Sequence, residues 1–330
     1  MNMKKQIQKI AVMTSGGDSP GMNAAIRAVV RTAVFYKLDP YGIYRGYQGL
    51  IEGDIERFTA RDVSNIINRG GTILKTARSK EFRTVEGRKK AYEQLKKHGI
   101  DALVVIGGDG SFTGAQIFSE EFDFPVIGIP ATIDNDIFGT DFSIGFDTAS
   151  NTATEAIDKI RDTASSHDRL FFIEVMGRNA GFLALYSGIA GGAEEILIPE
   201  ENIGIDRLVE SLRRSKRAGK TSSIVVVAEG DKTGKNVFEL AQYVEENLKE
   251  YESRVVIVGH IQRGGCPTTF DRVLASRLGV KAVEVLLDGK NNIMVGFRNN
   301  TVEVTPLIEA IKLKREINKE LLAIVDILTT

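Results

Sequence analysis

Residues 102–116 read ALVVIGGDGSFTGAQ, in which a short apolar run ends in a glycine-rich turn that is followed by a helical pattern. Short apolar runs that are rich in β-branched residues and end in glycine are typical of buried strands. The same order recurs at 10–14, before SGGDSPG and a helical pattern over Met22–Phe35, and at 171–175, before MGRNAG. Strands that alternate with helices predict parallel α/β layers with helices on both faces of each sheet.

Three further strands are predicted, and each ends in a polar cluster. They cover 126–129, 224–228 and 255–258, and they precede PATIDND, Glu229 and GHIQRGG. In parallel α/β sheets, ligands bind beyond the carboxyl ends of the strands. We therefore expect the polar clusters to form one or two binding clefts. The chain contains no repeat or linker, which favours two α/β lobes joined by tight crossovers.

The composition excludes several classes of function. The 330 residues are enough for two domains, and the 43 basic and 44 acidic residues nearly balance, so nothing points to nucleic acid or another polyanion as a partner. The single cysteine, Cys266, excludes an internal disulfide. No apolar run reaches the ~20 residues that a membrane span needs. We expect a cytoplasmic protein with no membrane partner.

Two glycine-rich loops are candidates for phosphate binding. The first, Thr14–Asp18, follows a strand and precedes a helix, where backbone N–H groups and the helix N-terminus attract anions. By itself, a tight turn explains this loop equally well. The second, Gly107–Ser111, contains Asp109, whose charge beside a polyphosphate would be costly without a bridging Mg²⁺ ion. A GGDG loop also occurs in lipid kinases and dinucleotide kinases, so it indicates phosphoryl transfer without naming the acceptor.

The segment Thr132–Asp136, TIDND, contains two carboxylates at positions i and i+2. In an extended chain, Asp134 and Asp136 would share a face, as a general base and a second acid require. A solvated Asx turn is the alternative, and it would be preferred for an isolated triplet. The position at a strand end, just after Pro130, favours the catalytic interpretation.

Arginines and one histidine near strand ends could provide further ligand contacts. The planar guanidinium group suits phosphate oxygens, and an arginine near the transferring group can stabilise transition-state charge. His260 lies among polar residues in GHIQRGG, where a structural role and a substrate contact are equally good interpretations. The arginine candidates are Arg78, Arg169, Arg178, Arg254 and Arg263.

Eight segments of the chain together resemble the signature segments of the bacterial ATP-dependent 6-phosphofructokinase family (type A). They occur in the family's order, within a resemblance that extends from about residue 9 to past residue 280: TSGGDSPGMNAAIR, INRGGTILKTAR, GIDALVVIGGDGS, TIDNDIFGTD, IGFDTA, RDTASSHDR, EVMGRNAG and GHIQRGG. The resemblance implies an α/β fold of two Rossmann-like three-layer lobes with mainly parallel sheets, discontinuous in sequence. The larger, ATP-binding lobe would comprise 1–145 and 262–312, and the smaller, sugar-phosphate-binding lobe 146–261 and 313–330.

The resemblance also implies an activity. Members transfer the terminal phosphate of ATP to the 1-hydroxyl of fructose 6-phosphate, the committed step of glycolysis, with Mg²⁺ as cofactor. They are homotetramers whose active site lies between the lobes and borrows residues from a neighbouring subunit, and ADP and phosphoenolpyruvate are effectors. Three alternatives stay open: a pyrophosphate-dependent phosphofructokinase, a kinase of a related sugar phosphate such as tagatose 6-phosphate, and an inactive nucleotide sensor.

Site residues follow from the resemblance position by position. Asp134 resembles the catalytic base and Asp136 an assisting acid near the metal, and Thr132, Arg78 and Arg178 complete the catalytic set. The residues that resemble the ATP and Mg²⁺ site are Gly17, Arg78, Ser79, Arg83, Arg88, Gly108, Asp109, Gly110 and Ser111, with Asp109 on the metal. Those that resemble sugar-phosphate contacts are Thr132, Asp134, Met176, Gly177, Arg178, Glu229, His260 and Arg263, with Arg169 and Arg254 reaching the 6-phosphate from the adjacent subunit.

Two positions bear on the phosphate donor. Pyrophosphate enzymes of the family resemble each other in an Asp at the position of Gly110 and a Lys at the position of Ala131. Gly110 leaves room for the α-phosphate region of ATP, and Ala131 supplies no compensating charge, so ATP is favoured as the donor.

An effector site is expected, in altered form. The residues that match the family's pattern are Arg27, Arg31, Arg161, Glu194 and Lys220, with Gly192 nearby and Ser222 where a histidine is often found. Ala60 and Ala218 stand where an arginine and a lysine are common, although Arg61 and Arg217 could partly substitute. We therefore expect weakened binding of anionic effectors.

Overall fold

The computed structural model describes residues 7–167, 169–201, 204–220 and 222–328. The chain divides into two compact units, and it crosses between them several times. Unit 1 comprises Met1–Thr132, Ile137–Thr148 and Arg263–Arg315, and unit 2 comprises Ile133–Asp136, Ala149–Gln262 and Glu316–Thr330. Each unit is built on a sheet covered by helices, so the predicted fold class of discontinuous α/β lobes is confirmed. Which ligand binds to which lobe stays a prediction.

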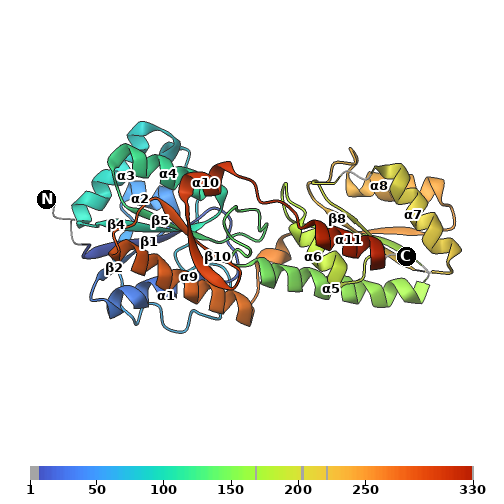
Figure 1. The fold of residues 1–330 in the computed structure, drawn as a ribbon, viewed down its shortest axis with the longest axis horizontal. Helices are drawn as coiled ribbons and strands as arrows, with labels where there is room; N and C mark the ends of the chain where they lie inside the picture. Colours follow the sequence, from blue (N-terminus) through green and yellow to red (C-terminus); the bar gives the residue numbers. More distant parts are fainter. Residues whose placement is uncertain (1–6, 168, 202–203, 221, 329–330) are drawn as a thin grey trace. The chain divides into compact units, whose positions relative to one another are not determined.

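Unit 1 contains a seven-stranded sheet in the order β11-β10-β5-β4-β1-β2-β3 (Figure 1). The pairs β2–β3 and β10–β11 at its two edges are antiparallel, and the remaining pairs are parallel. The strands are β1 (Lys9–Ser15), β2 (Asp39–Ile43), β3 (Ile55–Arg57), β4 (Ala102–Gly107), β5 (Val126–Pro130), β10 (Ile293–Arg298) and β11 (Thr301–Pro306). The strands predicted at 10–14, 102–106 and 126–129 are thus present, in the middle of the sheet.

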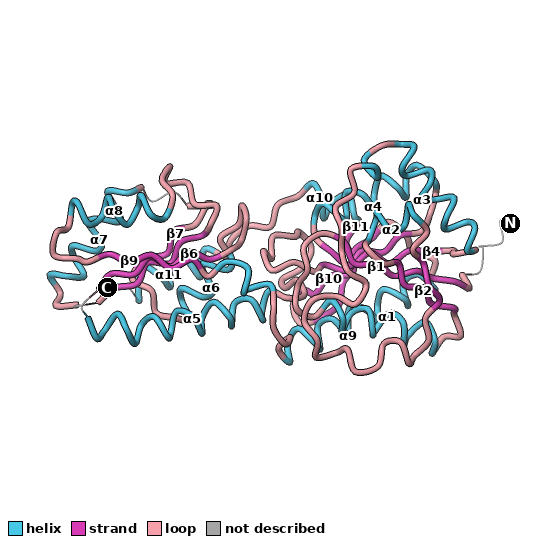
Figure 2. Tube along the Cα trace, turned by 180° about the vertical axis from the view of Figure 1, so that it is seen from behind, coloured by secondary structure: helices cyan, strands magenta, loops and turns pink. Residues whose placement is uncertain are grey.

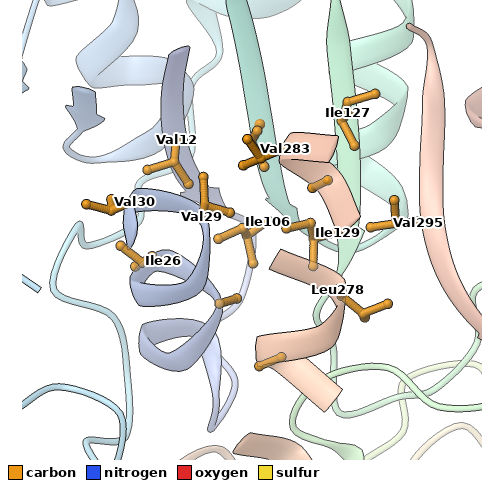
Figure 3. Close-up of a cluster of buried hydrophobic side chains, with 14 of the residues drawn as sticks. Val12, Ile26, Val29, Val30, Ile106, Ile127, Ile129, Leu278, Val283 and Val295 are labelled. Atoms are coloured by element: carbon orange, nitrogen blue, oxygen red, sulfur yellow. The ribbon is translucent and has the colours of Figure 1, made fainter. Parts of the chain in front are cut away.

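Helices cover both faces of this sheet, because successive side chains of its apolar strands point in opposite directions. In β1, Val12 belongs to the core beneath α1 and α9, whereas Met13 belongs to the core on the opposite face, beneath α2, α3, α4 and α10. Figure 3 shows the first core, where Val12 and Ile106 from the strands meet side chains of α1 and α9. The helices are α1 (Met22–Phe35), α2 (Gly46–Glu52), the 3₁₀ turn η1 (Glu81–Arg83), α3 (Val85–His98), α4 (Asp109–Phe122), α9 (Thr269–Leu287) and α10 (Leu307–Lys312).

Unit 2 contains a four-stranded sheet, whose strands are magenta in Figure 2. All its strands are parallel, in the order β7-β8-β6-β9. Leu208 of α7 and Leu240 of α8 pack with Phe172 of β6 in the core on one face. The strands are β6 (Leu170–Val175), β7 (Glu195–Leu197), β8 (Ser223–Ala228) and β9 (Ser253–Ile257). The other elements are α5 (Phe146–His167), which begins in unit 1, α6 (Phe182–Ala190), α7 (Ile205–Arg217), α8 (Val237–Asn247), the 3₁₀ turn η2 (Gly259–Arg263) and α11 (Lys319–Leu328). Within the described part of the chain, no helix is long and apolar enough to cross a membrane.

Candidate active site

The two glycine-rich loops of unit 1 lie side by side at the carboxyl edge of the sheet. Strands β1 and β4 are parallel neighbours, and their register pairs Ser15 with Gly107, so both loops begin at the same level. The approach is close: a Cβ at Gly107 would lie 2.5 Å from the carbonyl oxygen of Ser15, and one at Gly16 would lie 3.3 Å from the hydroxyl of Ser111. The structure therefore brings together the two loops that the sequence singled out.

The second loop leads into the N-terminus of α4, where the backbone is open to a ligand. Helix α4 begins at Asp109 after the N-cap residue Gly108, and Asp109 and Gly110 are exposed, whereas Ser111 is buried. A Cβ at Gly110 would meet no atom within 4 Å, and one at Gly108 would make only an ordinary contact with Thr132. Packing therefore does not require glycine at these two positions, whereas a phosphate approaching the first turn of α4 would.

The loop also suits a magnesium ion. In phosphoryl-transfer enzymes, Mg²⁺ is held by one or two carboxylates together with phosphate oxygens and water. The described residues contain no group of three or more His, Cys, Asp or Glu side chains that could hold a metal by themselves. An ion shared between Asp109 and a bound polyphosphate fits this arrangement.

Arg263 lies against the first loop. Its Nη1 donates to the carbonyl oxygen of Asp18 at 3.2 Å, and a Cβ at Gly17 would lie 2.6 Å from the same nitrogen. Arg263 and the loop that it contacts both belong to unit 1. The sequence predicted Arg263 as a sugar contact, and the structure adds a contact with the loop that we expect to bind phosphate.

The other predicted nucleotide residues of unit 1 surround the turn η1. Arg78 and Arg83 are exposed, and the hydroxyl of Ser79 accepts the N–H of Phe82 at 3.1 Å. Arg88 is different, because its guanidinium group is buried and donates to protein acceptors: both carboxylate oxygens of Glu121 at 2.6 Å and the carbonyl oxygens of Phe82 and Arg83. These bonds make Arg88 a support for η1, and the hydrogen bonds to Glu121 raise the pKa of its guanidinium. Whether Arg88 also lines a nucleotide pocket stays a prediction.

The TIDND segment follows β5, and it is not extended. Asn135 has φ of 54°, a left-handed conformation that Asn tolerates better than most residues, and Ile133 and Asp134 form a turn. The prediction that Asp134 and Asp136 share a face because the chain is extended was therefore wrong. Asp134 is 8% exposed and Asp136 is half-buried. Thr132 belongs to unit 1 and the two aspartates belong to unit 2.

In unit 2, Met176, Gly177, Arg178 and Glu229 gather at the carboxyl ends of β6 and β8. Met176 is buried, whereas Arg178 and Glu229 are exposed. The N–H of Arg178 donates to Oε1 of Glu229 at 2.6 Å. Nearby, burial and the charge of Glu229 raise the pKa of Glu174. His260 follows β9 at the same edge of the sheet and is exposed. Five predicted sugar contacts thus lie at one edge of one sheet.

Arg169 and Arg254 lie at the other end of that sheet. Strands β6 and β9 begin at Leu170 and Ser253, which pair with each other. Glu252 holds the two arginines together: it accepts from Nε of Arg169 at 3.1 Å and from Nη2 of Arg254. The hydrogen bond from Arg169 lowers the pKa of Glu252. Because a strand of six residues spans about 20 Å, these arginines are far from Arg178 and Glu229 of the same chain.

The predicted effector residues fall into separate groups. In unit 2, Arg161 donates to the carbonyl oxygens of Gly191 and Gly192, and its Nη1 lies 3.9 Å from the buried Glu194. Lys220 and Ser222 flank position 221, which lies outside the described residues. In unit 1, Arg27 and Arg31 lie on α1, where burial and the neighbouring Arg31 lower the pKa of Arg27.

Comparisons with known proteins give the family. The profile of the family described as Phosphofructokinase matches residues 9–286. The chain is 57% identical to an ATP-dependent 6-phosphofructokinase of Halalkalibacterium halodurans over 96% of this chain and 97% of that protein. It is also 57% identical to ATP-dependent 6-phosphofructokinase 1 of Thermus thermophilus, over 98% and 99%. The structure of phosphofructokinase from Saccharomyces cerevisiae superposes with a TM-score of 0.89 at 38% identity, covering 98% of this chain and 47% of that chain. The chain belongs to the phosphofructokinase family.

Proposed function

We propose that this chain transfers the terminal phosphate of ATP to the 1-hydroxyl of fructose 6-phosphate, giving fructose 1,6-bisphosphate and ADP. The observation that carries the proposal is the open first turn of α4, where Asp109 and Gly110 lie beside the loop after β1. The chain is also 57% identical to an enzyme named ATP-dependent 6-phosphofructokinase. These substrates belong to glycolysis, so we expect the enzyme in the cytoplasm.

The donor preference follows from two positions. At Gly110, a side chain would project into open space that the α-phosphate region of ATP needs. Ala131 is 1% exposed and belongs to the core under α1 and α9, and its methyl group supplies no charge that would compensate for the missing nucleotide of a pyrophosphate donor. ATP is therefore favoured over pyrophosphate.

Each part of the proposed site has a distinct task in the reaction. Asp134 accepts the proton of the sugar 1-hydroxyl as that oxygen attacks the γ-phosphorus, and ADP leaves as the bond between the γ-phosphorus and the β,γ-bridging oxygen breaks. The backbone N–H groups after β1 and at the start of α4 orient the phosphates, and Arg78 and Arg178 stabilise the charge that develops on the transferring group. Mg²⁺ on Asp109, when bound, supplies charge neutralisation at the phosphates. Asp136 assists near the metal, and Thr132 contacts the sugar.

The assembly follows from the position of Arg169 and Arg254 at the amino end of the small sheet. One sugar phosphate cannot contact both ends of a six-residue strand, so a sugar bound at Arg178 and Glu229 would take Arg169 and Arg254, the proposed cations for its 6-phosphate, from a second copy. We therefore propose a homotetramer with shared active sites. ADP and phosphoenolpyruvate are the proposed effectors, bound weakly because Ala60 and Ala218 supply no charge.

A donor and acceptor assay tests the function. Fructose 6-phosphate and tagatose 6-phosphate are each supplied with Mg-ATP and with Mg-pyrophosphate, and product formation is followed. Turnover of fructose 6-phosphate with ATP alone is expected, and Asp134→Ser should lower kcat by about 10²–10⁴-fold. Turnover with pyrophosphate alone would overturn the donor, a preference for tagatose 6-phosphate would overturn the acceptor, and no turnover at all would favour a nucleotide sensor.

A further inference from the structure

Asp271 is a fully buried carboxylate in the first turn of α9, and it closes the N-terminus of another helix. Its Oδ1 accepts the N–H of Gly145 at 2.8 Å, and its Oδ2 accepts the N–H of Thr148 at 2.9 Å and the hydroxyl of Thr148 at 2.5 Å. A buried charge is costly unless hydrogen bonds compensate for lost water, and three donors converge here. The donors are the backbone and side chain at the start of α5.

The two helices cap each other. The hydroxyl of Thr148, whose proton points at Asp271, accepts the N–H of Thr268 at 3.0 Å. Thr268 is the N-cap residue of α9, and its hydroxyl donates to Oδ2 of Asp147 at 2.5 Å. Side chains in the first turn of α5 thus accept hydrogen bonds from the N-cap residue of α9. In return, a side chain in the first turn of α9 accepts the free N–H groups at the start of α5. Such a closed arrangement fixes the residues just before α5.

Those residues, 143–145, touch Thr132 and the strand that precedes it. The hydroxyl of Ser143 donates to the carbonyl oxygen of Thr132 at 2.7 Å. Ile144 forms a bridge with Ala131 and donates its N–H to the carbonyl oxygen of Pro130 at 3.0 Å. Segment 143–145 therefore sets the position at which the TIDND segment begins.

The same residues lie close to Ser19 and Gly21, which directly follow the first glycine-rich loop. A Cβ at Gly145 would lie 2.5 Å from Cβ of Ser19, and a Cβ at Gly21 would lie 2.6 Å from Cγ2 of Ile144. Because there is no room for even a methyl group at Gly145 or Gly21, a displacement of segment 143–145 also moves the residues around Ser19 and Gly21. The Cβ of Asp271 itself would lie 3.6 Å from a Cβ at Gly21.

We propose that Asp271 is a positioning residue for phosphoryl transfer. By holding segment 143–145, it places the loop after β1 and Thr132 relative to each other within unit 1, without contacting a ligand. This assignment rests on the proposed function, since it gives a task to the loop that is proposed to bind ATP phosphates.

The decisive variant is Asp271→Asn, which keeps the shape but turns one acceptor oxygen into an NH₂ group that faces donors. In the folded variant, we expect kcat to fall about 10- to 100-fold and the KM for Mg-ATP to rise, as a displacement of about 1 Å would cause. The Kd for fructose 6-phosphate, measured by titration without nucleotide, should change less than the KM for Mg-ATP, because most of the predicted sugar contacts belong to unit 2, whereas this network belongs to unit 1. A role limited to stability would change none of these values in the folded fraction.

A matched pair at Thr148 covers the case in which Asp271→Asn does not fold. Thr148→Ser keeps the hydroxyl that joins the two caps, and Thr148→Val removes it at nearly constant volume. Thr148→Val should raise the KM for Mg-ATP and lower kcat, and Thr148→Ser should resemble the wild type.

Two results would overturn the role of Asp271: unchanged Mg-ATP kinetics in folded Asp271→Asn, or an equal loss of nucleotide and sugar affinity. If Asp271→Asn does not fold, indistinguishable Thr148 variants would overturn it. If the wild type transfers no phosphate, the proposed function fails, and the Kd for Mg-ATP in the same variants still decides whether Asp271 positions the loop.

Discussion

The backbone N–H of Arg178 donates to Oε1 of Glu229 across 2.6 Å, and Arg178 has a left-handed backbone with φ of 57°. Such a conformation costs a residue other than glycine about 1–2 kcal/mol, so it needs support. Glu229 provides this support on one side. Gly230 provides it on the other, since a Cβ there would lie 2.0 Å from the carbonyl oxygen of Arg178. Glu229 therefore fixes the backbone of Arg178, a proposed transition-state cation, before any ligand binds.

Removal of this support should be visible in sugar kinetics. Glu229→Ala loses a hydrogen bond to a charged acceptor, and we expect the KM for fructose 6-phosphate to rise by about tenfold or more. Glu229→Gln keeps an acceptor oxygen for the N–H of Arg178, so its KM should rise less. Initial rates at saturating Mg-ATP compare the two variants. Equal KM values would show that the hydrogen bond to Arg178 is not what matters.

The glycines of the second loop should separate stability from nucleotide binding. Gly110→Ala adds a methyl group to open space in a helical turn, so the melting temperature should stay or rise slightly, since Gly costs a helix about 1 kcal/mol relative to Ala. The KM for Mg-ATP should rise, because the methyl group occupies space that the nucleotide needs.

Gly107→Ala is the matched control for this prediction. Its methyl group would lie 2.5 Å from the carbonyl oxygen of Ser15, so the melting temperature should fall clearly. The prediction is checked by measuring the melting temperature and the KM for Mg-ATP of both variants. An unchanged KM in Gly110→Ala would remove the support that this glycine gives to ATP as the donor.

Shared active sites should allow two inactive variants to complement each other. Asp134→Ser lacks the proposed base and Arg254→Ala lacks a cation at the far end of the sheet, so each alone should be nearly inactive. In a random one-to-one mixture, half of the base-bearing subunits face a neighbour with an intact Arg254, so about a quarter of all sites are complete.

The complementation is measured as the activity of co-expressed subunits relative to the wild type. Asp134→Ser co-expressed with Asp136→Asn is the control. Both substitutions lie in the segment that one subunit contributes to a site, so no mixed site would be complete. No recovery of activity in the first mixture would argue against sites shared between copies.

The sequence predicted the middle of both sheets because local patterns carry that information. The helix at Met22–Phe35 and the strand at 102–106 follow from apolar runs and their glycine endings, and both are present. The short antiparallel strands at the edges of the large sheet carry too few apolar residues to stand out. The eight signature segments predicted the family, which the comparisons confirm.

Site features that depend on distant partners were not predictable from local patterns. Arg88 pairs with a glutamate 33 positions away, and Asp271 binds segments more than 120 positions away. No single-sequence periodicity encodes such pairs, and Asp271 looks like an ordinary acid in the first turn of a helix. The turn at Asn135 was missed because a strand end followed by alternating acids is compatible with both extended and left-handed backbone.

Asp271 should also have a signature in the pH dependence of stability. Burial raises the pKa of Asp271 to about 6, although hydrogen bonds from Thr148 and Gly145 oppose this shift, and the charge of Asp147 adds to it. The folded protein therefore binds this proton more tightly than the unfolded chain. As the pH falls from 7.5 to 5, the group should contribute progressively more to the free energy of unfolding, at up to about 1.4 kcal/mol per unit of pH. Urea unfolding of the wild type and of Asp271→Asn across this range isolates the effect, because other titrating groups cancel in the difference.

The free energy of unfolding of the wild type should increase relative to that of Asp271→Asn as the pH falls. Thr148→Ser, which keeps Asp271, should show the same pH dependence as the wild type. A difference that moves the other way would mean that the hydrogen bonds outweigh burial and hold the pKa of Asp271 below its ordinary value.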